Sequence, residues 1–106
     1  MGDKDLTSKL KGRSVNVITM KWGDEKLYNH LGDILFVEPA YIEIDEGIFQ
    51  GHLAFAGFGE AVYKIEDKDK KILYQNDQVL EAYKRNMVES EEEREEIRSS
   101  GKFFLD

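Results

Sequence analysis

Residues 40–65, AYIEIDEGIFQGHLAFAGFGEAVYKI, decide the fold because their apolar and polar residues alternate on both sides of glycine-containing turns. If Glu46 and Gly47 form a two-residue hairpin loop, the flanking strands bring apolar residues opposite one another. The pairs on this face are Ile44 with Phe49, Ile42 with Gly51, and Ala40 with Leu53, while Glu43 faces Gln50 and Tyr41 faces His52 on the other. The pattern predicts an antiparallel hairpin with one buried face.

A second hairpin is predicted around Gly57-Phe58-Gly59, taken as a three-residue loop. Its apolar pairs are Phe55 with Ala61, Leu53 with Tyr63, and Gly51 with Ile65, while Ala56 faces Glu60 and His52 faces Lys64 toward water. Gly59 is predicted to have a positive φ, which costs glycine little because it has no Cβ. A phosphate-binding loop is not favoured, because Val62 stands where a third glycine is needed and a strand is predicted to follow.

The N-terminal half predicts further strands. Residues 14–22 are rich in β-branched residues, but their apolar face changes after Val17, which predicts a bulge or burial on both faces. Residues 26–31 fit a strand or one helical turn, Gly32 is expected to interrupt, and residues 34–37 form a short buried strand. Pro39 marks a strand end or an edge.

Helices are predicted near both ends. Residues 5–12 fit one or two helical turns that Gly12 ends. A short strand is expected over residues 71–74, and Asn76 or Asp77 can cap a helix with apolar residues at helical spacing. Ser90 and Glu93 form a capping-box pattern that predicts a second helix or a kink.

These elements predict a mainly β (α+β) chain: a small antiparallel SH3/Sm-like barrel or strongly curved sheet, with a short N-terminal helix and a C-terminal helix packed on it. An open α+β sheet with the helix across one face is the alternative architecture. We expect residues 1–88 to form a single globular domain that includes the first part of the C-terminal helix. Residues 89–106 would be an acidic helical extension with an apolar tail.

The order of several segments is similar to that of Sm-like small barrels. The segments are LKGRSVNV at 10–17, Gly23-Asp24, Gly32-Asp33-Ile34, YIEID at 41–45 and GEAVYKI at 59–65. The resemblance implies a short N-terminal helix that leads into strongly bent antiparallel strands. Glu66 stands where the family's Ile-Arg-Gly motif has glycine, and Pro39-Ala40 replace the polar loop that holds RNA bases. It therefore implies an architecture and not RNA binding.

Composition excludes several classes of function. The 106-residue chain has no cysteine, so disulfides, thiolate nucleophiles and cysteine-ligated zinc are excluded. Of the formal charge of −7, the six glutamates and one arginine of residues 89–96 contribute −5, which leaves −2 for the rest. No basic stripe predicts direct nucleic-acid binding, and no apolar run is long enough to span a membrane. The expected location is cytoplasmic.

No constellation in the sequence predicts catalysis, a cofactor or a metal. His30 and His52 are the only histidines, and each is expected to be a surface or hydrogen-bonded residue without a functional role. Asp67 and Asp69 resemble the start of a calcium loop, but the following positions lack its glycine and glutamate, so a turn is predicted. An enzyme is therefore not the favoured class.

The C-terminal segment is the predicted partner-binding region. Its residues are Glu91, Glu92, Glu93, Glu95, Glu96, Phe103, Phe104 and Leu105. Dense charge can steer association with a basic surface. The apolar tail is costly to leave in water, so we expect it to fold back, either as an edge strand or as a cap on the barrel, or, as the alternative, to dock on another chain.

Three functions follow from these observations. The first is a non-enzymatic cytosolic protein-binding or regulatory module that uses the C-terminal segment for a protein partner or for self-association. The second is an acidic nucleic-acid mimic that inhibits a DNA- or RNA-binding protein. The third is a ligand or enzymatic pocket in the sheet, which would bring tyrosine, histidine and carboxylate side chains together.

Overall fold

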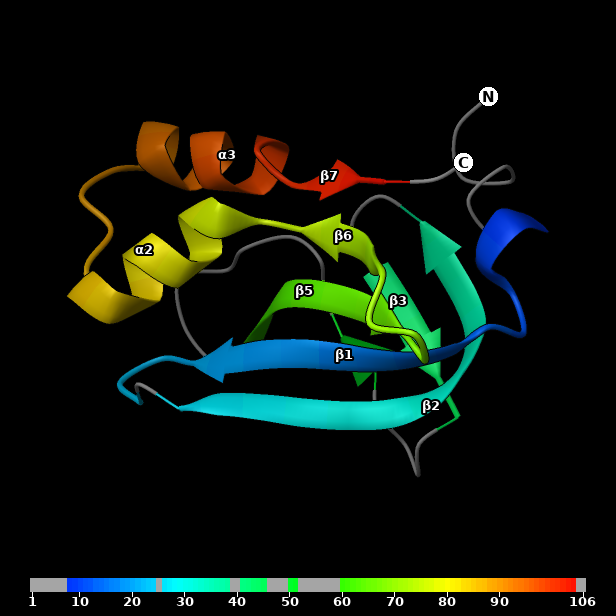
Figure 1. The fold of residues 1–106 in the computed structure, drawn as a ribbon. Helices are drawn as coiled ribbons and strands as arrows, with labels where there is room; N and C mark the ends of the chain where they lie inside the picture. The colour runs from blue at the N-terminus through cyan, green and yellow to red at the C-terminus, as the bar shows by residue number, and fades with distance from the viewer. Residues whose placement is uncertain (1–7, 25, 39–40, 46–49, 52–59, 105–106) are drawn as a thin grey trace.

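The computed structural model describes residues 8–24, 26–38, 41–45, 50–51 and 60–104. Seven strands form one sheet in the order β4-β3-β2-β1-β5-β6-β7, and neighbouring strands pair antiparallel throughout the described residues. The strands are β1 (Ser14–Lys21), β2 (Leu27–Glu38), β3 (Tyr41–Ile44), β4 (Gln50–Gly51), β5 (Glu60–Asp67), β6 (Ile72–Gln75) and β7 (Lys102–Phe103). The sheet curls into a half-barrel, with two short helices beside it (Figure 1). A mainly β chain with a strongly curved antiparallel sheet is thus confirmed.

β1 carries the predicted change of face. Val15 and Val17 are buried on what we call the inner face, whereas Met20 is buried on the outer face. The register between β1 and β5 shifts between Ile18 and Thr19, but the extra residue is Tyr63 of β5, since Ile18 pairs with Lys64 and Thr19 with Val62. Of the two predicted alternatives, burial on both faces is confirmed, whereas β1 itself pairs with β2 without a shift.

β2 is one continuous strand, so the prediction that Gly32 interrupts it is wrong. Gly32 pairs with Val15 inside the ladder between β2 and β1. Beyond it, Ile34 pairs with Ile44 of β3, so the strand changes partner and bends sharply (Figure 1). A glycine without a side chain allows a strand to bend without leaving the sheet.

The register of the first predicted hairpin is confirmed where the structure describes it. Ile42 pairs with Gly51 and Glu43 with Gln50, as the alternation of apolar residues requires. The predicted loop at Glu46-Gly47 lies outside the described residues.

The second predicted hairpin is wrong at the positions that can be compared. β5 pairs with β1 along one edge and with β6 along the other, so Ile65 lies between Val17 and Tyr74. Lys64 pairs with Gln75 of β6, whereas the prediction set His52 opposite Lys64. A strand has only two edges, and both are occupied here. The predicted loop and the positive φ of Gly59 lie outside the described residues.

The two faces of the sheet carry separate apolar clusters. The inner cluster consists of Leu10, Val15, Val17, Ile34, Val37, Ile42, Ile44, Val62, Ile65, Leu73 and Tyr74. The outer cluster consists of Met20, Ala61, Val79, Ala82, Tyr83 and Ile97 and therefore joins the sheet to both helices. Trp22 meets the ring of Tyr83 edge-on at a centroid distance of 5.1 Å. Residues 8–10 are helical, and Leu10 lies in the inner cluster.

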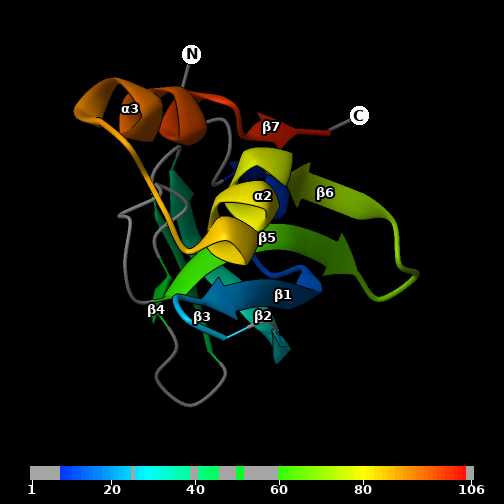
Figure 2. The same ribbon diagram turned by 90° about the vertical axis from the view of Figure 1, so that its left-hand side faces the viewer.

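Helix α2 (Asp77–Arg85) starts at one of the two predicted caps, Asn76, whose side chain accepts hydrogen bonds from the Gln78 and Val79 N–H groups. It ends at Asn86, which has a positive φ of 52°. Helix α3 (Glu91–Ser99) has Ser90 as its N-cap. Of the two predicted alternatives, a second helix or a kink, the second helix is therefore confirmed. Figure 2 shows α2 in front of the sheet, with α3 and the edge strand β7 above it.

The C-terminal tail folds back as far as the structure describes it. Phe103 pairs with Tyr74 of β6, and their rings lie 4.8 Å apart between centroids. The Phe104 N–H donates to the Leu73 carbonyl at 2.9 Å. The preferred prediction that the tail folds back is confirmed for these residues, in its edge-strand form, and Leu105 lies outside the described residues.

Candidate functional site

A groove between α2 and α3 contains part of the predicted partner-binding segment. Its volume is about 380 Å³, and it is lined by Gln78, Arg85, Glu89, Ser90, Glu92, Glu93, Glu96 and Ile97. Four of these side chains are carboxylates and one is a guanidinium. We call this surface the α2–α3 groove.

The start of α3 fixes the position of the glutamates. The Ser90 hydroxyl accepts the Glu93 N–H at 3.2 Å, and the Glu93 carboxylate reaches back to the Glu89 N–H at 2.8 Å. Glu93 also pairs with Arg85 of α2. The Glu89 N–H, followed by Arg85, lowers the pKa of the Glu93 carboxyl, while the hydrogen bond to Glu93 raises the pKa of Arg85. This link holds the two walls of the groove together.

The remaining glutamates of α3 fall into two groups. Glu91 pairs with Arg94, and Glu95 pairs with Arg98, one helical turn away in each case. Glu92 and Glu96 have no ion-pair partner among the described residues, and both line the groove. Residues four apart lie on the same face of a helix. The helix therefore presents one pair of neutralised carboxylates and one pair that is available for a basic partner.

The predicted apolar residues lie beside this groove and not within it. Phe103 is half-buried against Tyr74, whereas Phe104 is 49% exposed. Phe104 lines a second hollow with Gln75, Asp77, Gln78, Ser100 and Lys102. Gln78 borders both depressions, so the acidic and apolar parts of the predicted region adjoin there.

A cluster of Thr19, His30 and Glu60 was not predicted as a site. The Thr19 hydroxyl donates to Glu60 Oε2, and His30 Nε2 lies 2.8 Å from the same oxygen. Because a carboxylate only accepts, the imidazole must donate through Nε2. Thr19 is fully buried, and His30 is partly buried, so the prediction of a hydrogen-bonded histidine is confirmed.

The environment of Glu60 sets its charge. Burial alone would raise the pKa of its carboxyl, but the hydrogen bonds from Thr19 and His30 outweigh burial and lower the pKa below its usual value. Burial, with a smaller contribution from the charge of Glu60, raises the pKa of Tyr83 to about 12. The same oxygen serves both the hydroxyl and the imidazole, so this geometry is not the relay in which histidine activates a nucleophile.

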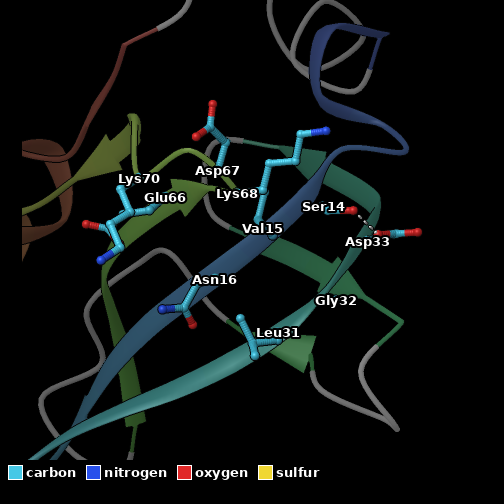
Figure 3. Close-up of a pocket in the computed structure, with 10 residues that line it drawn as sticks. All are labelled: Ser14, Val15, Asn16, Leu31, Gly32, Asp33, Glu66, Asp67, Lys68 and Lys70. Carbon is cyan, nitrogen blue, oxygen red and sulfur yellow. Dashed lines mark hydrogen bonds between the residues drawn. The ribbon is translucent and has the colours of Figure 1, made fainter.

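A larger depression of about 440 Å³ lies on the outer face, over the N-terminal half of β1 (Figure 3). We call it the outer-face groove; its lining residues are Ser14, Val15, Asn16, Leu31, Gly32, Asp33, Glu66, Asp67, Lys68 and Lys70. Lys70 has a positive φ of 66° in the predicted turn after β5, and the Asp67 carboxylate accepts the N–H groups of Asp69 and Lys71 there. The predicted polar turn is therefore confirmed.

Within the described part of the chain, no three histidine, cysteine, aspartate or glutamate residues are grouped to hold a metal ion. None of the helices described is both long and apolar enough to cross a membrane. No protein-family model matches the chain, and no match was found among curated proteins or solved structures.

Proposed function

We propose that the chain is a non-enzymatic protein-binding module of the cytosol whose α2–α3 groove receives a basic segment of a protein partner. The observation that supports this proposal is the excess of carboxylates in the groove: four glutamates face one arginine. Glu93 is engaged by Arg85, while Glu89, Glu92 and Glu96 have no ion pair among the described residues. The groove thus offers three acceptor groups of one sign.

The expected interaction is fast and sensitive to salt. Each of these glutamates is exposed, and an exposed ion pair contributes only about 0–1 kcal/mol. Several like charges in one groove add up, however, and raise the rate of encounter with a basic partner. The formal charge of −7 on the whole chain acts in the same direction.

Equilibrium binding of a labelled arginine-rich peptide tests the proposal. Glu92→Gln together with Glu96→Gln should weaken binding by about tenfold at low salt, which corresponds to about 1.4 kcal/mol. The matched control is Glu91→Gln together with Glu95→Gln, which removes the same charge at the same spacing from the carboxylates paired with Arg94 and Arg98. An equal loss in both variants would show that net charge alone attracts the peptide and would refute a specific groove.

We also propose a type of barrel for the sheet and a domain boundary at residue 88. We infer an SH3/Sm-like barrel, supported by the sharp bend of β2 and the bulge in β5 where it pairs with β1. The division at residue 88 stays a prediction. Ile97 and Phe103, which follow residue 88, pack in the apolar clusters formed with residues 1–88, and these contacts favour a single folded unit over a separate extension. Phe104 is the apolar residue that we assign to the partner surface beside Gln78.

A further inference from the structure

Two depressions of different chemistry adjoin along α3, which leads into β7 (Figure 1). The α2–α3 groove is lined by four glutamates and one arginine, a formal charge of −3. The second hollow, which we call the Phe104 hollow, is lined by one carboxylate, Asp77, and one cation, Lys102, and is formally neutral. Lys102 has no ion pair among the described residues, so it disfavours a further cation there. The surface therefore changes from acidic to neutral along the helix.

Two of the polar groups that line the Phe104 hollow are engaged within the protein. The Asp77 carboxylate accepts a hydrogen bond from Gln75 Nε2 at 2.6 Å, and the Ser100 hydroxyl donates to Asn76 Oδ1 at 2.7 Å. The side chain of Phe104, by contrast, is 49% exposed. An exposed ring gains more from an apolar neighbour than from water, because contact removes apolar surface from solvent. The hollow is therefore suited to an apolar or aromatic side chain.

The spacing of residues along α3 matches the repeat of an extended peptide. Glu92, Glu96 and the C-cap Ser100 follow one another at intervals of four residues. A helix rises by about 1.5 Å per residue, so each interval is about 6 Å along the axis. Side chains on one face of an extended chain recur at every second residue, about 6.6 Å apart. Three alternate side chains of such a peptide thus reach Glu92, Glu96 and the Phe104 hollow in turn.

We propose that the partner presents an extended segment with two basic residues and one apolar or aromatic residue at alternate positions, the apolar residue being at one end. This inference rests on the proposed function of the α2–α3 groove and names the sequence that the groove recognises. Glu92 and Glu96, which have no ion pair among the described residues, receive the two cations. The ring of Phe104 receives the apolar side chain. An extended segment can run in either direction, so the apolar residue either follows or precedes the basic pair.

Fluorescence anisotropy of labelled peptides with the full chain at low salt tests this order of residues. The peptides Thr-Arg-Thr-Arg-Thr-Phe-Thr and Thr-Phe-Thr-Arg-Thr-Arg-Thr have the phenylalanine at one end. The matched control, Thr-Arg-Thr-Phe-Thr-Arg-Thr, has the same composition but places the ring between the arginines, opposite Glu96. Threonine spacers favour the extended conformation in all three. One of the first two peptides should bind about tenfold more tightly than the control.

A double-mutant cycle tests the contact with Phe104. Replacing the phenylalanine of the tighter peptide by serine should weaken binding to the wild-type chain about fivefold, but binding to Phe104→Ser less than about twofold. Leu31→Ser is the control, because Leu31 is also exposed but lies on the outer face of the sheet, and it should behave like the wild-type chain. Phe104→Ser keeps the backbone hydrogen bond to the Leu73 carbonyl, and thermal melts check that each variant is folded.

Two results would overturn this inference and leave the proposed function intact. The first is equal binding of the three peptides, which would mean that charge alone attracts them. The second is a peptide phenylalanine that contributes as much with Phe104→Ser as with the wild-type chain. A chain that binds neither these peptides nor the arginine-rich peptide would instead refute the proposed function, and this inference with it.

Discussion

Asn76 connects α2, α3 and β5 through its buried side chain and its backbone N–H. Its Oδ1 accepts from the Gln78 N–H and the Ser100 hydroxyl, and its Nδ2 donates to the Ile97 carbonyl at 3.0 Å. Its own N–H donates to the Tyr63 carbonyl of β5 at 2.8 Å. The residue is fully buried, so its side-chain amide makes these hydrogen bonds out of reach of water.

Asn76→Ala should therefore lower the free energy of unfolding by about 2–4 kcal/mol, since it removes a helix cap and the buried hydrogen bond from Nδ2 to the Ile97 carbonyl. Urea denaturation at neutral pH measures the change. Asp77→Ala is the matched control, because Asp77 is the exposed neighbour on the first turn of α2. Equal losses in the two variants would show that the amide network is unimportant.

Glu60 should make stability sensitive to acid. Its carboxyl has a folded-state pKa below the usual 4.5, so the unfolded chain binds the proton more readily. The stabilisation is complete above about pH 4.5 and is lost as the pH falls through the lowered folded-state value. Glu60→Gln should consequently lose stability at pH 7 but show a smaller further loss on acidification than the wild-type chain.

Denaturation midpoints of both chains at pH 7 and pH 3 provide the comparison. Asp24 and Glu93 also have lowered pKa values, so their contribution to the acid response remains in the variant. A variant with an unchanged pH dependence would contradict the role assigned to Glu60.

At the scale of elements, Gly101 determines how α3 passes into β7. A Cβ at this position would lie 2.1 Å from the Tyr74 hydroxyl oxygen and 2.8 Å from Cζ of the same ring. Tyr74 is buried and packs against Phe103, so its ring has little room to move. The absence of a side chain at Gly101 is thus a condition for the close approach of β7 to β6.

Gly101→Ala should destabilise the fold by about 1–3 kcal/mol through overpacking, and the loss should begin at β7. Hydrogen exchange of the Phe104 N–H, which donates to Leu73, should become faster than in the wild-type chain. Ser99→Ala, at an exposed position of α3, is the control. Unchanged protection of Phe104 would mean that Tyr74 can make room for the methyl group.

Elements with a local chemical cause were the ones that the sequence could predict. The caps at Asn76 and Ser90 act within one turn, and the change of face in β1 is visible in its own residues. The partners of β5 were not predictable in this way. The alternation of apolar and polar residues tells only which residues can face each other. β1 fits opposite β5 as well as the segment before Gly57 does, since Val17 opposite Ile65 is also an apolar pair.

At the scale of the whole molecule, long-range pairing creates the features that the sequence does not reveal. Thr19, His30 and Glu60 meet only because β1 pairs with both β2 and β5. The sequence predicted one wall of the α2–α3 groove, the glutamates of residues 89–96. It did not predict the other wall, which consists of Arg85 and Gln78 of α2. The division of these glutamates into paired and unpaired residues depends on the phase of α3, which its cap at Ser90 sets.

The central claim is that a basic segment binds in the α2–α3 groove. The most direct measurement is an NMR titration of the full chain with the arginine-rich peptide, which locates binding on the backbone. We predict that the largest amide shifts lie in residues 89–97 and near Gln78 and Arg85. Shifts centred on the outer-face groove, or spread evenly over exposed acidic residues, would contradict the claim.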